Sequence, residues 1–184
     1  YAWTHSAAAL GFVGAVNVAP LLALSLPAGA LADRRDRKRL IAAGTAVLIF
    51  INLALAALAF FHDAIPPLAP LQWGNATLRH LALIFERHTD PATLHFDHPA
   101  LPLVFLLLLA HACVRVLIWP ARSSIVPLLV PGGALGNAIT WNASAFELAT
   151  ITGPAVGGLL VDKIGFPTVY ALGSLLKIVF LVLL

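Results

Sequence analysis

Long runs of hydrophobic residues alternate with shorter polar stretches along the 184-residue chain. Five runs are long enough to cross the roughly 30 Å hydrocarbon core of a bilayer, which takes about 20 residues as a helix. They cover residues 7–32, 40–61, 100–119, 137–161 and 166–184. The runs are continuous, whereas barrel strands would alternate apolar and polar positions, and a helix satisfies its backbone polar groups within one segment. The pattern therefore predicts an all-α integral membrane protein with five transmembrane helices.

The composition agrees with this pattern and excludes most other classes of protein. Sixty per cent of the residues are hydrophobic, only 10% are charged, and the mean hydropathy is +0.94. Soluble domains carry about 25% charged residues, and a soluble protein this apolar would expose large patches and aggregate. We therefore exclude a soluble enzyme, a nucleic-acid-binding protein and a disordered chain. Because the chain has no methionine and ends within a hydrophobic run, we expect it to be an internal part of a longer protein.

Basic residues divide unevenly between the two sides of the membrane. If the five helices alternate in direction, one side receives Arg34, Arg35, Arg37, Lys38, Arg39 and Arg122, and the other receives Arg79, Arg87 and Lys163. Loops rich in Lys and Arg stay in the cytoplasm, where they also contact anionic membrane lipids. The sequence therefore predicts that residues 33–39 and 120–136 are cytoplasmic and that residues 62–99 are extracytoplasmic.

The extracytoplasmic stretch, residues 62–99, is long and contains five of the seven histidines. Within it, residues 77–87 have the spacing of a short amphipathic helix, which would lie on the outer leaflet or pack on the helix bundle. His95, Asp97 and His98 are metal-ligand types close together, but no cysteine supports them and the remaining histidines are irregularly spaced. We expect polar loop residues here and no metal site.

The most specific pattern covers residues 29–40, at the end of the first hydrophobic run. Gly29 would let its helix approach a neighbour closely, and Asp33 is placed to pair with a base or with the N–H groups of a nearby helix start. The stretch resembles the loop signature of the major facilitator superfamily, Gly-x-x-x-Asp-Arg/Lys-x-Gly-x-Arg/Lys-Arg/Lys. The matching residues are Gly29, Asp33, Arg34, Lys38 and Arg39, whereas Asp36 replaces the second glycine. The resemblance implies that Asp33 belongs to a charge-paired latch that favours one gating state.

A second pattern lies inside the fourth hydrophobic run and reads Gly153-Pro154-Ala-Val-Gly157-Gly158. Proline kinks a helix by removing a backbone hydrogen bond, and glycines leave a smooth face on which another helix can pack. These residues resemble the core of a helix motif typical of the antiporters of the superfamily. A packing kink, which any membrane protein with several spans can contain, is the alternative.

The connection between the third and fourth runs resembles one branch of the superfamily, the enterobactin exporters. Pro-Ala-Arg at 120–122, Pro127, Val130-Pro131 and Asn137-Ala138 recur in the order typical of that branch. The resemblance implies that the five runs are the second to sixth helices of the family, so that the chain is an incomplete N-terminal half of a transporter. The first helix and the second half would lie outside this sequence, and residues 62–99 would be a loop insertion.

Three charged residues fall at membrane depth, where such groups are costly and often functional. Glu147 and Lys177 each lie about 15 Å inside their runs, and Arg115 lies about one turn from the predicted end of the third run. Glu147 would couple proton movement to transport or contact the substrate; alternatively, it is structural and pairs with Lys177 or bonds to Thr150 and Thr152. Arg115 would reach the headgroups or contact a substrate.

The resemblance implies a secondary active transporter that exports a small amphipathic or drug-like molecule, coupled to protons, by alternating access. The sequence contains no ATP-binding loop of the form Gly-x-x-x-x-Gly-Lys-Ser/Thr, so the expected energy source is an ion gradient. We expect no enzyme activity, no cofactor and no nucleic-acid partner, and a location in the bacterial inner membrane. Two alternatives stay open: a lipid-handling permease fused to an enzyme outside this sequence, and a membrane scaffold that has lost transport.

Overall fold

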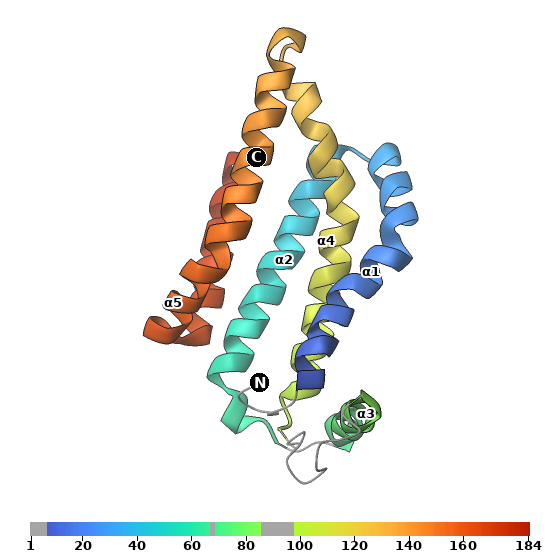
Figure 1. Ribbon diagram of the computed structural model, residues 1–184, viewed down its shortest axis with the longest axis vertical. Coiled ribbons are helices and arrows are strands. Elements are labelled where there is room, and N and C mark those ends of the chain that lie inside the picture. Colours follow the sequence, from blue (N-terminus) through green and yellow to red (C-terminus); the bar gives the residue numbers. More distant parts are fainter. Residues whose placement is uncertain (1–6, 67–68, 86–97) are drawn as a thin grey trace.

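The computed structural model describes residues 7–66, 69–85 and 98–184. This described part of the chain consists of helices and short turns without strands, which confirms the all-α prediction. The helices are α1 (Ala7–Arg34), α2 (Arg37–Phe60), α3 (Ala69–Phe85), α4 (Leu101–Leu129) and α5 (Leu135–Leu183), and two 3-10 turns are η1 (His62–Ala64) and η3 (Gly132–Ala134) (Figure 1).

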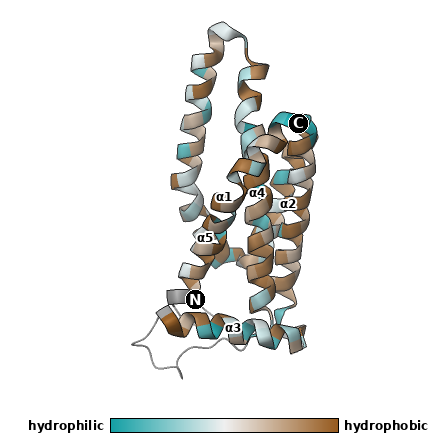
Figure 2. Cartoon of the chain, turned by 90° about the vertical axis from the view of Figure 1, so that its right-hand side faces the viewer, coloured by the Kyte–Doolittle hydropathy of each residue, from teal (hydrophilic) through white to brown (hydrophobic). Residues whose placement is uncertain are grey.

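The long helices form a bundle in which α4 lies between α1 and α2, and α5 packs mainly on α2 (Figure 1). Although α1 and α2 follow each other in the sequence, they scarcely touch, because α4 separates them. The shorter helix α3 lies crosswise at one end of the bundle (Figure 2). The α1–α2 connection and the α4–α5 connection both lie toward the opposite end, so the two loops predicted to share one side of the membrane share one end of the bundle (Figure 1).

Among the described residues, four helices are long and apolar enough to cross a membrane, namely α1, α2, α4 and α5. This differs from the five spans predicted, and the difference lies in α5, whose 49 residues contain both the fourth and the fifth predicted span. Gly165 interrupts α5 with φ 78° and ψ 162°, and the chain reverses there (Figure 1). A single glycine makes the turn between the fourth and fifth predicted spans, so no separate loop divides the two limbs of α5.

The end of the chain confirms that α5 doubles back. Leu184, which follows α5 directly, packs against a cluster of Ala32, Ile41 and Ala121. Ala32 lies in the last turns of α1 and Ile41 in the first turns of α2. The second limb of α5, residues 166–183, therefore returns to the same end of the bundle as the α1–α2 connection.

Helix α4 is longer than the hydrophobic run predicted. The run was expected to end at Trp119, with residues 120–136 as the connection to the next span, but α4 continues through Pro120 and Pro127 to Leu129. Each proline removes only its own amide donor, and the residues on both sides of it keep helical hydrogen bonds. The connection between α4 and α5 is thus only the few residues around η3. The end of α4 and the start of α5 extend beyond the end of α2 (Figure 1).

The helices approach one another most closely where one of them carries a small residue. Gly44 of α2 faces Ile118 of α4 so closely that a β-carbon at Gly44 would collide with the Ile118 side chain. At the other end of the bundle, Ala9 of α1 and Ala82 of α3 pack with Leu101 of α4. Small side chains of this kind let helix backbones pack tightly within a membrane.

Candidate functional site

The basic loop between α1 and α2 is only two residues long, because α1 ends at Arg34 and α2 begins at Arg37. Asp36 is the N-cap of α2, and one of its carboxylate oxygens accepts a hydrogen bond from the backbone N–H of Arg39 at 2.9 Å. Its φ of −58° and ψ of 117° need no glycine. The aspartate that replaces the second glycine of the loop signature therefore has a structural role of its own, as an acidic residue at the start of a helix.

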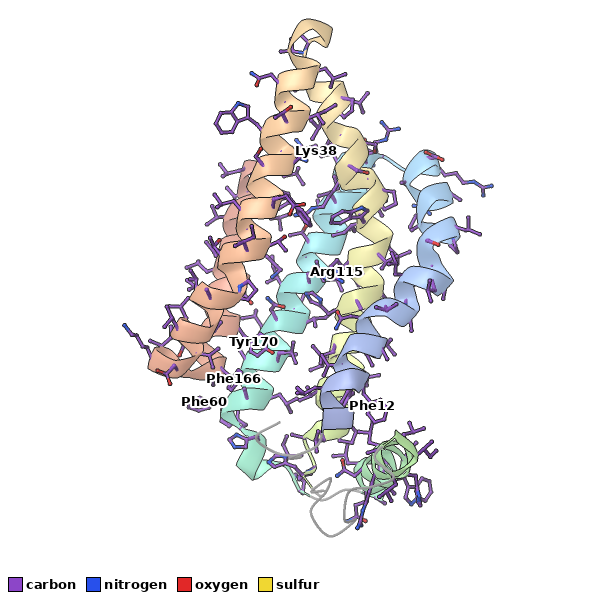
Figure 3. The ribbon with its side chains drawn as sticks, in the orientation of Figure 1. Phe12, Lys38, Phe60, Arg115, Phe166 and Tyr170 are labelled. Atoms are coloured by element: carbon purple, nitrogen blue, oxygen red, sulfur yellow. The ribbon has the colours of Figure 1, made fainter. Side chains whose placement is uncertain are left out.

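The other residues of this signature lie on the surface of the bundle end. Asp33, Arg34, Lys38 and Arg39 are exposed, and Figure 3 shows Lys38 near that end. No residue in the described part of the chain forms an ion pair with Asp33. A β-carbon built at Gly29 would meet no atom within 4 Å, so the close helix approach expected there is not made by the described residues.

The second pattern lies on the first limb of α5, residues 135–164. The helix runs through Pro154 without a break. β-Carbons built at Gly153, Gly157 and Gly158 would each meet no atom within 4 Å. The glycines thus form a smooth stretch of helix surface that the described helices leave uncovered.

Glu147 lies on the same limb and is exposed. Neither of the structural roles considered for it is observed. The Thr150 and Thr152 hydroxyls donate instead to backbone carbonyls of their own helix, those of Phe146 and Leu148, at 2.8 and 2.7 Å. Within the described ranges Glu147 forms no ion pair with Lys177. No ion pair or hydrogen bond to a described side chain therefore holds the carboxylate, which lies on an exposed stretch of α5.

Arg115 lies at the middle of a spanning helix. Because α4 extends to Leu129, Arg115 is the fifteenth of its 29 residues and is not one turn from its end, as had been predicted. Figure 3 places it midway between Lys38 at one end of the bundle and Phe166 toward the other. At about 1.5 Å per residue, some 20 Å of helix separate it from either end of α4. Whether its side chain reaches the headgroups therefore depends on which part of α4 lies within the bilayer.

Basic residues of α4 lie within electrostatic range of a basic residue of α5. His111, Arg115 and Arg122 are spaced by four and seven residues, which places them on one face of α4. Lys177, on the second limb of α5, is close enough to His111 and to Arg122 for their charges to interact, and Arg115 acts on His111 in the same way. Sequence reasoning weighed Arg115 and Lys177 separately and did not predict that they belong to one cluster.

Two aromatic contacts hold this part of α4 to both limbs of α5. The guanidinium carbon of Arg122 lies 4.8 Å from the centre of the Phe180 ring, on the second limb. The rings of Trp119 and Phe146 meet edge to face at 5.8 Å, which connects α4 to the first limb. The contacts place one turn of α4 against both limbs, beside the cationic cluster. In the sequence, Arg115, Trp119 and Arg122 follow one another at intervals of three or four residues, and this helical spacing could have predicted that one face of α4 makes these contacts.

The histidines near α3 serve a structural purpose in the part of the chain that can be described. The rings of His62 and His98 stack at 5.5 Å, and the Asn75 amide donates to the His98 carbonyl oxygen at 3.1 Å. No group of three or more His, Cys, Asp or Glu side chains suited to a metal occurs among the described residues. His95 and Asp97, which belonged to the candidate metal set, lie outside them.

Comparison with known families identifies the class of protein. The chain matches the family model described as Major Facilitator Superfamily over residues 2–184, and it therefore belongs to this superfamily of membrane transporters. No curated protein and no solved structure matches the chain. The four apolar helices are in accord with this assignment.

Proposed function

We propose that this protein is a secondary active transporter that exports a small amphipathic or drug-like molecule in exchange for protons. The single observation that carries the proposal is the set of ionisable side chains at membrane depth: Arg115 and Lys177 within one cationic cluster, and Glu147 on the adjacent limb of α5. Charges at this depth are costly unless they face protein or a water-filled cavity. Such a cavity is where transporters of this kind bind substrate.

The roles follow from the chemistry of each group. Glu147 is the group that can gain and lose a proton, so it is the proposed coupling residue. Arg115 and Lys177 are the proposed contacts for a polar or anionic part of the substrate. The proposed packing surface for helices that move during alternating access consists of Gly153, Pro154, Gly157 and Gly158. Asp33, Arg34, Lys38 and Arg39 belong to the gating loop. Support for export comes from the resemblance of residues 120–138 to the enterobactin exporters.

The exposed side of α5 supports the proposal that further helices complete the transporter. Every residue from Leu135 to Ile164 is exposed or partly exposed, including Glu147 and several hydroxyl-bearing residues. A carboxylate would not face lipid when a protein surface is available. We therefore propose that the described helices are part of an N-terminal half with α5 crossing the membrane twice, and that a first helix and a second half cover this side.

The distribution of basic residues also supports an orientation. The end of the bundle with the α1–α2 and α4–α5 connections carries Arg34, Arg35, Arg37, Lys38 and Arg39. We propose that this end is cytoplasmic in a bacterial inner membrane and that α3 lies on the extracytoplasmic side.

The experiment that tests the proposal compares Glu147→Gln with Asp162→Asn in the full-length transporter, reconstituted in vesicles with an imposed pH gradient. Asp162 is an exposed acid near the turn at Gly165, away from the cationic cluster, and is the matched control. We expect Glu147→Gln to abolish the stimulation of efflux by the pH gradient, while Asp162→Asn retains it. Unchanged transport and unchanged pH dependence in Glu147→Gln would disprove the coupling role.

A further inference from the structure

Helix α3 is fixed to the bundle by one of its faces. Ala82 is fully buried, where it packs with Ala9 of α1 and Leu101 of α4, and Leu78 packs against the same cluster. Asn75, one turn before Leu78 on this side, is buried and donates to the His98 carbonyl oxygen. The helix is seen end-on in Figure 1 and lengthwise in Figure 2, crosswise to the spanning helices. Its position on the bundle is therefore supported by packing against α1 and α4.

A second apolar edge of α3 is left uncovered. Trp73, Leu81 and Ile84 are 76%, 41% and 57% exposed. At about 100° per residue, Trp73 and Ile84 lie within 20° of each other on the helix, and Leu81 is a further 60° toward the packed face. The exposed Thr77 and His80 lie on the same edge, so the edge is amphipathic with its three large side chains apolar. Gln72 and Arg79 lie on the opposite edge. The apolar half of α3 is thus divided into a part that packs on the bundle and a part that packs on nothing in the described chain.

We propose that the edge formed by Trp73, Leu81 and Ile84 inserts into the membrane interface and that α3 anchors this end of the transporter to the lipid leaflet. The helix lies at the level where α1 and α4 begin, which is the depth of the headgroups if these helices span the hydrocarbon core. Leu10 of α1, next in the chain to the buried Ala9, is exposed as well.

The chemistry of the edge favours lipid as the partner. Tryptophan prefers the membrane interface, where its ring is apolar and its N–H stays hydrated. Helices that lie in the interface have an apolar side and a polar side along their length, which is the division between the Trp73 edge and the Gln72–Arg79 edge. This anchoring role is independent of the transport reaction, and its test requires no substrate.

Tryptophan fluorescence in the full-length protein gives a direct test. Trp3, Trp119 and Trp141, together with any tryptophan elsewhere in the full-length chain, are replaced by Phe, so that Trp73 is the only emitter. The protein is then reconstituted in vesicles whose acyl chains are brominated close to the headgroup. We expect the brominated lipids to quench at least half of the Trp73 emission and iodide to quench less than one fifth of it.

The matched control places the tryptophan on the polar edge, as Gln72→Trp with Trp73→Phe in the same background. Iodide should quench this variant strongly and brominated lipid only weakly. Quenching of Trp73 by iodide but not by lipid would overturn the proposal, and so would protection from both, because another protein surface would then cover the edge. The same result for both variants would also overturn it, since the two edges would then be equivalent.

Discussion

The backbone of Gly44 on α2 lies against the side chain of Ile118 on α4, without room for a β-carbon between them. Ile118 is almost completely buried, and Gly44 is buried as well. Helix α4 can lie between α1 and α2 because α2 carries no side chain at this point. The position of Arg115, one turn before Ile118, therefore depends on a glycine of another helix.

A methyl group at Gly44 should weaken the contact between α2 and α4. We expect Gly44→Ala to lower the free energy of unfolding by about 1–3 kcal/mol, because overfilling a packed contact forces side chains or backbone to move. The measurement is reversible unfolding of the protein in mixed detergent micelles. Gly14→Ala on α1 is the control, since a β-carbon there meets no atom within 4 Å. Equal effects of the two substitutions would contradict the close contact.

The capping role of Asp36 can be separated from its charge. Asp36→Ala removes the acceptor for the Arg39 N–H and should destabilise α2 by about 0.5–2 kcal/mol, whereas Asp36→Asn should retain most of the stability and Asp36→Gly should cost only a few tenths. Amide hydrogen exchange at Arg39 reports on the bond itself and should accelerate in Asp36→Ala. If Asp36→Asn were as destabilising as Asp36→Ala, Asp36 would stabilise α2 through its charge and not through the capping hydrogen bond.

The reversal of α5 requires glycine at position 165. With φ 78° and ψ 162°, Gly165 occupies a region of backbone conformation that is nearly exclusive to glycine. We expect Gly165→Ala to cost about 1–3 kcal/mol of stability, measured by unfolding in mixed micelles. Gly136→Ala is the matched control, because Gly136 is helical, exposed and surrounded by open space. A loss at Gly136 as large as that at Gly165 would rule out backbone conformation as the cause.

The contact between Arg122 and Phe180 should contribute to the association of α4 with the second limb of α5. A double-mutant cycle of Arg122→Gln and Phe180→Leu isolates the interaction. We expect a coupling energy of about 0.5–2 kcal/mol, the range for a cation over an aromatic ring. Phe180→Tyr keeps the ring and should retain the coupling. A coupling energy near zero would show that the two side chains pack independently.

Much of the fold followed from local patterns in the sequence. The hydrophobic runs predicted α1, α2 and the interior of α4, and the basic cluster at residues 34–39 marked the connection between α1 and α2. The break between the fourth and fifth hydrophobic runs contains the reversal at Gly165, although the helical limbs on its two sides join without a loop. These features were accessible because hydrophobicity, charge and glycine conformation are properties of short stretches of chain.

The candidate site was predicted less completely. Glu147, Lys177 and Arg115 were recognised as charges in apolar runs. Among the described residues, however, Glu147 does not pair with Lys177, and Arg115 lies at the middle of α4 instead of one turn from its end. The end of α4 was misplaced because the hydrophobic run ends at Trp119, whereas the helix continues through Pro120 and Pro127 to Leu129. The N-cap of α2 was also missed, since Asp36 was considered only as a departure from the loop signature.

The sequence by itself determined that this protein is helical, membrane-embedded and related to the major facilitator superfamily, because each of these depends on composition or on spacing within one segment. Only the tertiary structure decided that Arg115, Arg122 and Lys177 share one cluster. It also decided which apolar side chains of α3 pack on the bundle and which stay exposed. Such relationships depend on the rotation and stagger of one helix against another. Those are determined by contacts between residues far apart in the chain, such as Gly44 with Ile118.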